Sequence, residues 1–430
     1  MPREVVRIGF LGAGTVGTGA LALLARNAAS IAQKVGCPLE VVRVADLDWD
    51  RPRPVDIPEA KRTTDASQVL EDPSIDIVVE VIGGVQPALS FVLRALANGK
   101  SVVTTNKELI AKHGKEILEE AGKRSLDVCF EGAVGGGIPI IRPLKQCLAG
   151  NRIQRILGIV NGTTNFILTE MSRGGKGFPE VLAEAQAKGY AEANPADDVE
   201  GVDASYKLAI LASIAFTSRV DLADVYREGI THIGAADMEY ARELGYVIKL
   251  LAIGVDTPQG LELRVHPALL PSSHPLAAVN DVYNAIFVEG DGVGRVMFYG
   301  RGAGADPTGS AVVGDLVDIA RNLLRGATGR VSCTCFLDRP VKDMAQVQSE
   351  FYLRMQVVDR PGVLAKIATV FGEELVSLQS VVQRASYGDH AEIVWITHRV
   401  AEGNLVRSVE RIGRLPEVVE ISSKLRVMEG

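Results

Sequence analysis

The densest group of chemically active side chains lies between residues 185 and 207. The Asn194-Pro195 pair predicts a turn, because a proline disfavours helical geometry in the residue before it, and an apolar helix is expected after that turn. Asp203 and Lys207 are four residues apart on this helix, so they share one face. A lysine placed in this way can stabilise and protonate a developing oxyanion, but the pair alone is equally typical of a solvated helix start.

The whole segment follows a longer pattern than this pair. Its fixed positions are Ala185, Gly189, Tyr190, Ala191, Asn194, Pro195, Asp198, Val199, Gly201, Asp203 and Lys207. At every one of these positions the segment resembles the signature of homoserine dehydrogenases. The resemblance implies that Glu192 binds the substrate ammonium and that Asp203 holds the substrate and orients Lys207, with Gly189 in the same substrate-binding loop. The remaining carboxylates are expected to support the loop: Asp197, Asp198 and Glu200.

The composition restricts the class of protein. A chain of 430 residues is too long for a single core, so two or three domains are expected. The net charge of -7 argues against a nucleic-acid partner. We expect no membrane span and no targeting leader, because neither pattern occurs. Five cysteines without framework spacing favour a cytoplasmic location, and neither the Cys333-x-Cys335 pair nor the scattered histidines predict a zinc site.

The chain begins with a pattern typical of dinucleotide binding. Glu4 to Leu11 is a short apolar run that predicts a buried parallel strand, and a glycine-rich turn and then a helical stretch follow it. The run from Gly12 to Gly17, which contains Thr15 and Val16, precedes the predicted helix, TGALALLARNAASIA; in this run Gly12 allows a tight turn, Gly14 lets the backbone approach a pyrophosphate, and Gly17 lets the helix pack on the strand. The phosphates are expected at the helix N-terminus. A Rossmann-type site for NAD or NADP is therefore predicted.

The choice between the two cofactors stays open at this stage. The second strand, Leu39 to Ala45, is followed by Asp46, where an acid binds the adenosine ribose and favours NAD. Asp46 comes later after the glycines than the usual spacing, which an insertion around Ser30 to Pro38 explains. Three nearby arginines are either surface charges or ligands for the 2′-phosphate of NADP: Arg43, Arg51 and Arg53.

A second lysine follows another expected strand. Strands are predicted at Ile75 to Gly84 and in the segment SVVTT, with a helix at Pro87 to Asn98 between them. The SVVTT strand runs into Asn106 and Lys107, and the sequence TTNK resembles the family motif that carries a lysine beside the nicotinamide. Lys107 is therefore expected to contact the cofactor and take part in catalysis, the alternative being a plain surface cation.

A run of glycines follows the next strand, Leu126 to Phe130, and leaves main-chain carbonyls available. Relatives in the family hold a monovalent cation, Na+ or K+, through main-chain oxygens of this run, and neutral carbonyls suit such an ion. The alternative is a hinge between domains. By position in the motif, the ligands would be the main-chain oxygens of Glu131, Val134, Gly136 and Ile138.

Two more motifs complete the expected substrate domain. A strand from Ile153 to Val160 ends in NGTTN, which resembles the family and implies that Asn161 and Thr163 line the substrate cleft. Further strands, at Leu261 to Leu270, 284–290 and 294–300, suggest a sheet with helices on one side. The turn GRGAG, with Gly302 at the cofactor, and the helix Ser310 to Arg325 resemble the family's return to the nucleotide domain. Relatives have alanine at the position of Gly309.

The last 80 residues read as a separate module joined by a polar linker, Cys335 to Ser349. Strands near Phe351 to Val358, Ser377 to Ala385, Ala391 to His398 and Val418 to Val427, with helices to Glu374 and at Leu405 to Leu415, give a βαββαβ order. The segment DRPGVLA resembles ACT domains, which bind amino acids at their interfaces; the alternative is a module that only assembles subunits. The expected regulatory residues are Asp359, Gly362 and Leu364.

Together these patterns predict an α/β protein with three parts. They are a Rossmann-type domain at residues 1–132, completed by about 301–335, an α+β substrate and dimerisation domain at 133–300, and a ferredoxin-like ACT domain at 350–430. The implied activity is NAD(P)-dependent interconversion of L-homoserine and L-aspartate 4-semialdehyde in threonine, methionine and isoleucine biosynthesis. L-threonine inhibition and a homodimer or homotetramer are also expected. The alternatives are another amino-acid or 2-oxoacid dehydrogenase, or a non-catalytic nucleotide and amino-acid sensor.

Overall fold

The structure, a computed structural model, describes residues 4–331, 333–383 and 388–429. It is an α/β protein that divides into two compact units. The first unit comprises residues 1–156, 206–224 and 283–338, and the second comprises 157–205, 225–282 and 339–430. Two of the boundaries fall inside an element, strand β7 (Ile153–Ile159) and helix α9 (Val202–Ala215). No helix of the described ranges is long and apolar enough to span a membrane.

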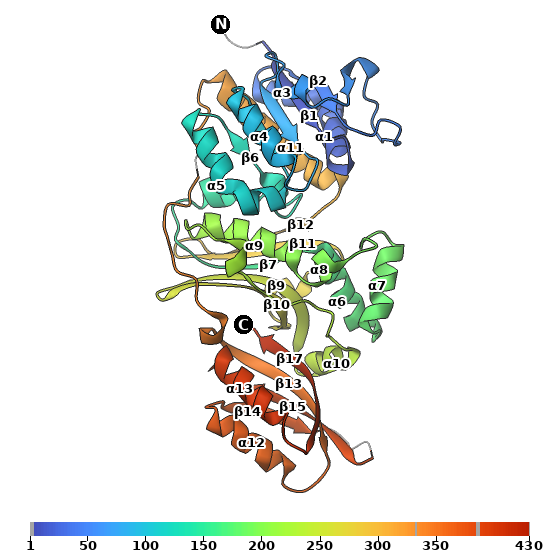
Figure 1. The fold of residues 1–430 in the computed structure, drawn as a ribbon, viewed down its shortest axis with the longest axis vertical. Helices are drawn as coiled ribbons and strands as arrows, with labels where there is room; N and C mark the ends of the chain where they lie inside the picture. The colour runs from blue at the N-terminus through green and yellow to red at the C-terminus, as the bar shows by residue number, and fades with distance from the viewer. Residues whose placement is uncertain (1–3, 332, 384–387, 430) are drawn as a thin grey trace. The chain divides into compact units, whose positions relative to one another are not determined.

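The first unit contains a parallel, Rossmann-like sheet in the order β3-β2-β1-β4-β5-β6 (Figure 1). Such an order places β1 and β4 at the point where the winding direction reverses, and ligands bind beyond the strand ends there. The strand Leu39–Ala45 has the bounds that the sequence predicts. The strand predicted from Glu4 begins later, at Val6, and the one predicted at Ile75 to Gly84 is shorter at both ends, Ile77–Glu80. The strands are β1 (Val6–Leu11), β2 (Leu39–Ala45), β3 (Arg62–Thr63), β4 (Ile77–Glu80), β5 (Ser101–Thr104) and β6 (Val128–Cys129).

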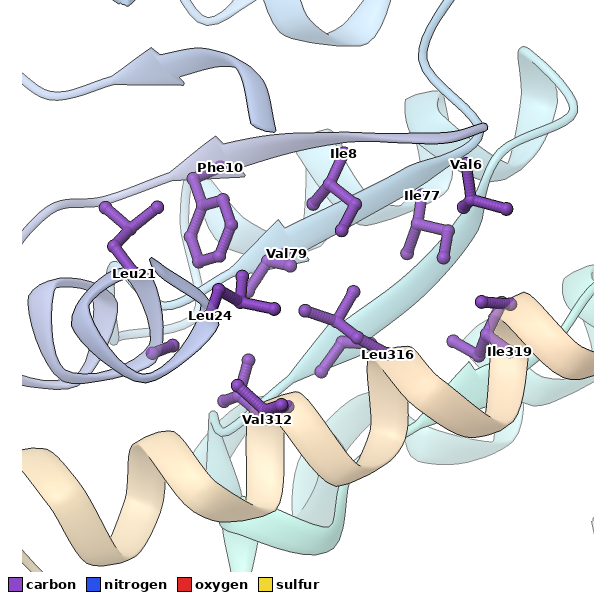
Figure 2. Close-up of a cluster of buried hydrophobic side chains, with 14 of the residues drawn as sticks. Val6, Ile8, Phe10, Leu21, Leu24, Ile77, Val79, Val312, Leu316 and Ile319 are labelled. Carbon is purple, nitrogen blue, oxygen red and sulfur yellow. The ribbon is translucent and has the colours of Figure 1, made fainter. Parts of the chain in front are cut away.

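Helices on the sheet bury one continuous apolar core. Figure 2 shows this core, in which Ile8 and Phe10 of β1 and Ile77 of β4 meet side chains of α1 and α11. The two helices approach closely, because a Cβ on Gly309 of α11 would meet the backbone of Ala20 at 2.7 Å. This contact explains the glycine in the present chain. The helices are α1 (Thr15–Arg26), α2 (Ala28–Val35), α3 (Ser67–Leu70), α4 (Ala88–Ala97), α5 (Lys107–Lys123) and α11 (Ala305–Leu324).

The first unit also holds an antiparallel hairpin, β11 (Tyr283–Gly290) and β12 (Gly294–Arg301). One face of β12 is exposed and carries two apolar side chains, Met297 at 42% and Tyr299 at 54% exposed, between Arg295 and Arg301. Tyr299 stacks on Tyr283 of the neighbouring strand with 5.2 Å between the ring centroids.

The second unit is built around an antiparallel hairpin of two long strands, β9 (Tyr246–Thr257) and β10 (Gly260–Pro271). The sequence predicts β10 but not β9, whose run of apolar residues is interrupted by Lys249. That lysine is buried, and its Nζ donates to Asn165 Oδ1, Val279 O and Asn280 Oδ1. Short elements surround the hairpin: α6 (Gly162–Gly174), α7 (Phe178–Ala187), α8 (Ala196–Val199), β8 (Tyr226–Arg227) and α10 (Ala235–Glu243).

The C-terminal part of the second unit has the predicted βαββαβ order, with one extra two-residue strand, β16. Its sheet runs β17-β13-β15-β14, with α12 and α13 beside it (Figure 1). Phe371 of α12 and Leu405 of α13 are buried in one cluster with Trp395 of β15. The expected second strand extends to Ala385, which lies outside the described residues. The elements are β13 (Gln348–Val358), α12 (Val363–Glu373), β14 (Leu378–Gln383), β15 (His390–Thr397), β16 (Val400–Ala401), α13 (Glu402–Ile412) and β17 (Val418–Val427).

The polar linker predicts a separate module, but this sheet is continuous with the substrate-domain hairpin. β17 pairs in parallel with β10, in the register Ala268 with Arg426 and Leu269 with Val427. Arg426 is 1% exposed and binds Glu402 through two hydrogen bonds and Glu228 through one. The tail is therefore fixed within the second unit by main-chain pairing and by a buried ion cluster.

Candidate active site

A single amide organises the carboxylates of the signature segment in the second unit. Asn161 begins α6 as its N-cap, and its Oδ1 accepts from the backbone N–H of Thr164 at 2.9 Å. The Nδ2 group of Asn161 then donates to Asp198 Oδ1 at 2.7 Å and to Asp203 Oδ2 at 2.9 Å. The cap fixes the amide, and the amide fixes two carboxylates that the chain places on separate helices, α8 and α9.

The loop between α7 and α8 is anchored from the same helix. Thr163 Oγ1 donates to the carbonyl oxygen of Tyr190 at 2.7 Å, and the Tyr190 ring meets Phe166 edge-on with 5.0 Å between centroids. Gly189 starts this loop, and Glu192 follows it with an exposed carboxylate. Asn161 and Thr163 therefore support the loop and its acids through side-chain hydrogen bonds, a connection that motif reading alone did not give.

The predicted pair on α9 is buried. Asp203 and Lys207 lie one helical turn apart, and they are 4% and 9% exposed. Ionisable side chains are rarely buried to this extent unless they are paired or functional. The burial separates this pair from an ordinary surface pair at the same spacing.

In the first unit, a buried chain of hydrogen bonds positions Lys107. Thr104 Oγ1 donates to Glu80 Oε2 at 2.6 Å and accepts from the backbone N–H of Asn106 at 3.0 Å. Asn106 caps α5 through Leu109 N–H, and its Nδ2 holds the carbonyl of Gly84 at 2.6 Å. Burial raises the pKa of the Glu80 carboxyl above its ordinary value, while Thr104 opposes the shift.

Sequence reasoning missed Glu80 and Asn106 as positioning residues. The available signal was a charged side chain at the last position of an otherwise apolar strand, since Glu80 ends β4 and is fully buried. Lys107 itself is the first residue of α5 and is half-buried. The hydrogen bonds of Glu80, Thr104 and Asn106 thus connect Gly84, after β4, to the start of the helix that carries Lys107.

The glycine-rich turn of the first unit fits a pyrophosphate. Gly12 has φ +103°, and a Cβ there would meet Val81 O at 2.9 Å; a Cβ on Gly17 would meet Gly12 O at 2.4 Å. Around Gly14, by contrast, no described atom lies within 4 Å of a Cβ position. Gly14 is the N-cap of α1, which begins at Thr15 and Val16 and receives no side-chain cap. The open N-terminal turn can bind phosphate oxygens.

Asp46 lies at the end of β2 and is already held by the turn. Its Oδ2 accepts from the backbone N–H of Ala13 at 2.6 Å, and its Oδ1 lies 3.3 Å from a guanidinium nitrogen of Arg53. Arg53 also donates to the carbonyl of Ala13 at 3.1 Å and lies 4.6 Å above the Trp49 ring. The acid and one of the three arginines predicted near it therefore form a pair at the same strand end.

A basic cavity of about 280 Å³ adjoins this pair. Arg51 and Arg53 line it, whereas Arg43 points elsewhere and donates to Ala60 O. Arg62, which the sequence analysis did not single out, provides a third guanidinium and lies 5.4 Å from the centroid of the Trp49 ring. Guanidinium groups suit phosphate recognition because they donate in a fixed planar fork.

The glycine run after β6 is tightly packed. A Cβ on Gly136 would meet Gly302 O at 2.4 Å, and one on Gly302 would clash with the Asn284 side chain. The Glu131 carboxylate accepts hydrogen bonds from the backbone N–H groups of residues 140–142. The main-chain oxygen of Glu131 is therefore the atom that this residue offers to an ion. Within the described residues, no hydrogen bond is accepted by the carbonyls of three other predicted ligands, Val134, Gly136 and Ile138.

The predicted regulatory residues lie at the start of α12 in the tail. Gly362 is the N-cap with φ +90°, and no described atom lies within 4 Å of a Cβ position there. Leu364 is 40% exposed, and Asp359 is exposed with its backbone N–H bonded to Asp389 O. This turn leaves backbone accessible to a small molecule.

Comparison with known proteins identifies all three parts. Residues 12–131 match the family described as homoserine dehydrogenase, NAD binding domain; residues 139–317 match homoserine dehydrogenase; and residues 351–417 match the ACT domain. The homoserine dehydrogenase of Corynebacterium glutamicum is 46% identical over 99% of this chain and 96% of its own length.

Solved structures agree with these matches. A homoserine dehydrogenase from Thiobacillus denitrificans has a TM-score of 0.93 and 42% identity, over 99% of each chain. A shorter hyperthermophilic archaeal homoserine dehydrogenase, solved in complex with NADPH, has a TM-score of 0.63 and 28% identity over 73% of this chain and 97% of its own. From these matches and the geometry of the glycine turn and signature segment, the chain belongs to the homoserine dehydrogenase family, as an oxidoreductase with an NAD-binding domain and a C-terminal ACT domain.

Proposed function

We propose that the chain interconverts L-homoserine and L-aspartate 4-semialdehyde with NAD or NADP. The observation that carries this proposal is the arrangement of the signature segment. The Asn161 amide holds Asp198 and Asp203, and buried Lys207 follows Asp203 by one turn of α9. Such burial of charge is costly unless the groups act on a ligand or on each other. The reaction belongs to the biosynthesis of threonine, methionine and isoleucine.

In this proposal, the lysines manage charge and proton at the substrate oxygen. The nicotinamide, when bound, supplies or accepts the hydride. Reduction of the aldehyde builds negative charge on the oxygen, which Lys207 and Lys107 stabilise and protonate. Asp203 orients Lys207 from the preceding turn of α9.

The substrate ammonium is assigned to Glu192. The Glu192 carboxylate is exposed, and the bond from Thr163 to Tyr190 O, not Glu192, holds the loop in place. The carboxylate can therefore bind a ligand without disturbing the loop. Asn161 and Gly189 shape the same loop and its acids. The contact adds specificity for an amino acid over a simple hydroxy acid.

We propose that the nucleotide site accepts NADP as well as NAD. A lone carboxylate at Asp46 would repel a 2′-phosphate, but here Arg53 lies 3.3 Å away and offsets that charge. The cavity beside it presents Arg51 and Arg62 for the phosphate. The archaeal relative solved with NADPH supports this assignment.

A monovalent cation, Na+ or K+, is proposed at the glycine run after β6. Main-chain oxygens of Val134, Gly136, Ile138 and Glu131 are the candidate ligands, and neutral carbonyls suit a hard monovalent ion. The ion would brace the turn that packs against Gly302, where the chain returns toward the nucleotide domain.

L-threonine is proposed as an inhibitor acting through the turn around Gly362. The match to the ACT domain supports an amino-acid effector, and the open backbone at this turn supports a small one. β12 lies at the edge of its sheet and exposes Met297 and Tyr299, which supports a homodimer or homotetramer, because unpaired strand edges favour pairing. A reducing cytoplasm suits five cysteines that form no disulfide, all of them among the described residues.

One steady-state experiment tests this function. Purified enzyme is assayed with homoserine against NAD and NADP, with Na+, K+ or neither, and with and without L-threonine. We expect homoserine-dependent cofactor reduction, turnover with both cofactors, stimulation by a cation and inhibition by threonine. Binding of cofactor and threonine without any turnover would instead identify a sensor, and turnover with another hydroxy acid but not homoserine would reject the substrate.

A further inference from the structure

Two cysteines that the active site does not use lie together at the start of the linker, in the first unit. The linker is held against that unit, since Leu337 N–H donates to Thr217 O at 2.8 Å and Cys335 Sγ contacts Ser213 O at 3.4 Å. The segment therefore has a defined conformation in which both thiols are half-buried.

The two sulfur atoms interact with each other. The side chains of Cys333 and Cys335 share a hydrogen bond, and the backbone N–H of Cys335 points at Cys333 Sγ with a separation of 3.5 Å. The side chain of Cys335, its backbone N–H and the charge of Lys145 together lower the pKa of the Cys333 thiol, although burial opposes the shift. The same pairing raises the pKa of Cys335. These shifts favour the thiolate at Cys333, beside the thiol of Cys335, whose Sγ donates to Ser213 O.

A cavity of about 430 Å³ opens beside these thiols. Its walls come from α5 and the second half of α9, from Phe130 and from the linker itself, and they are mainly apolar. A space of this size admits a small molecule rather than a macromolecule. A reactive sulfur, a second thiol in contact with it and room for a reagent are thus combined at one place.

We propose that Cys333 and Cys335 form a thiol–disulfide exchange site for low-molecular-weight disulfides. The Cys333 thiolate attacks one sulfur of the small disulfide, which forms a mixed disulfide and releases one thiol after it takes up a proton. Cys335 then loses its proton to solvent and attacks Cys333 Sγ, which forms the Cys333–Cys335 bond and releases the second thiol. Two protein thiols are oxidised by two electrons while one small disulfide is reduced to two thiols.

The product is expected to be reversible. Residues at this spacing span about 7 Å when extended, which is at the outer limit of about 6.8 Å for the Cα atoms of a disulfide. Cys333 Sγ already lies 3.5 Å from the backbone nitrogen of Cys335, so little movement separates the two residues. A disulfide closed between such near neighbours is strained, and strained disulfides are reduced readily.

The test uses oxidised glutathione as the probe, on the full-length enzyme and on the variants Cys333→Ser, Cys335→Ser and Cys147→Ser. Exposed Cys147 is the matched control. Intact-mass measurement and peptide mapping should show loss of two hydrogen atoms between Cys333 and Cys335 in the parent and in Cys147→Ser. Cys335→Ser should accumulate one glutathione on Cys333, Cys333→Ser should leave Cys335 unmodified, and dithiothreitol should reverse every product.

A rate measurement gives an independent check that does not need disulfide closure. An ordinary thiol with a pKa of about 8.5 is only about 3% thiolate at pH 7, so Cys333 should react with iodoacetamide about tenfold faster than Cys147. Equal rates, or an adduct on Cys335 when Cys333 is replaced, would overturn the assignment. Circular dichroism of each variant shows whether a lost reaction reflects a lost fold, and Cys147→Ser must retain the parent rate at Cys333.

Discussion

The second unit holds charged side chains in two contrasting ways. In the signature segment, the amide of Asn161 holds Asp198 and Asp203, Glu192 remains exposed, and the bonds come from a neutral group. In the tail, buried arginines meet carboxylates directly: Arg426 with Glu402 and Glu228, and Arg354 with Asp237 and Glu392. A hydrogen bond from the neutral Asn161 amide adds no charge that offsets the carboxylate, whereas a guanidinium partner does.

The contrast separates charges that serve a reaction from charges that serve the fold. Removing one partner of a buried ion pair leaves an uncompensated charge, which costs about 3–5 kcal/mol of stability. A carboxylate held by an amide can be replaced by its neutral analogue at much lower cost, because the hydrogen-bond geometry survives. Changes in the signature segment should therefore affect turnover, and changes in the tail cluster should affect stability.

The largest effect is expected for Lys207. Lys207→Ala should lower turnover by about 10²–10⁴-fold, the range for loss of a positioned proton-transfer group. Initial rates with homoserine at saturating cofactor measure this. The control is Lys115→Ala, which removes an exposed lysine of α5 that pairs with Glu119. Turnover within a few-fold of the parent would mean that Lys207 takes no part in the chemistry. The distinction between charges that serve the reaction and charges that serve the fold would then fail.

A comparable effect, on stability alone, is expected for the tail cluster. Arg426→Met should lower the free energy of unfolding by about 3–5 kcal/mol, because buried Glu402 and half-buried Glu228 lose the guanidinium that binds them both. Urea titration read by fluorescence measures this. Arg399→Met is the control, since Arg399 and Glu429 form an exposed pair. An unchanged midpoint would mean that the buried cluster does not hold the tail.

A buried acid of the first unit, Asp315, should make the stability of the fold depend on pH. Burial, and next the charge of Glu131, raise the pKa of Asp315 to about 7. The folded state therefore binds a proton that the unfolded state has lost, so stability falls as pH rises from about 4 to about 7 and is flat above. Relative to Asp315→Asn, the parent should lose about 2–3 kcal/mol between pH 5 and pH 7. Parallel stability curves for the two proteins would contradict this.

The smallest effect concerns substrate binding. Glu192→Gln should raise the KM for homoserine about tenfold with a smaller change in kcat, because a charge pair to the substrate ammonium acts in the ground and transition states alike. Asp197→Asn, an exposed neighbour in the same segment, should leave KM unchanged. A loss confined to kcat would assign Glu192 to the chemistry instead.

Local patterns predicted much of the fold and of the motifs. Two strands have their predicted bounds, Leu39–Ala45 and the final strand Val418–Val427. Each is rich in residues that favour strands. The glycine turn after β1 was predictable for the same reason, since its chemistry depends on residue type at fixed spacing.

What could not be predicted depends on contacts between distant residues. β9 was missed because Lys249 interrupts its apolar run. Its acceptors, Asn165, Val279 and Asn280, are distant in sequence and explain a lysine there. The union of the tail with β10 depends on Arg426 and Glu228, which are 198 residues apart. The bonds from Asn161 to two carboxylates are of the same kind, because a sequence pattern gives spacing along the chain but no partners in space.

The most direct test measures turnover and unfolding free energy together on two conservative variants, Asp203→Asn and Glu402→Gln. Both replace a buried carboxylate by its amide, one bonded to Asn161 and the other to Arg426. The account predicts that Asp203→Asn loses tenfold or more in turnover, as expected for a group that positions the proton donor, with the smaller loss of stability, and that Glu402→Gln has the larger loss of stability while the folded enzyme keeps its turnover. The reverse pattern, or equal losses of both quantities in both variants, would contradict it.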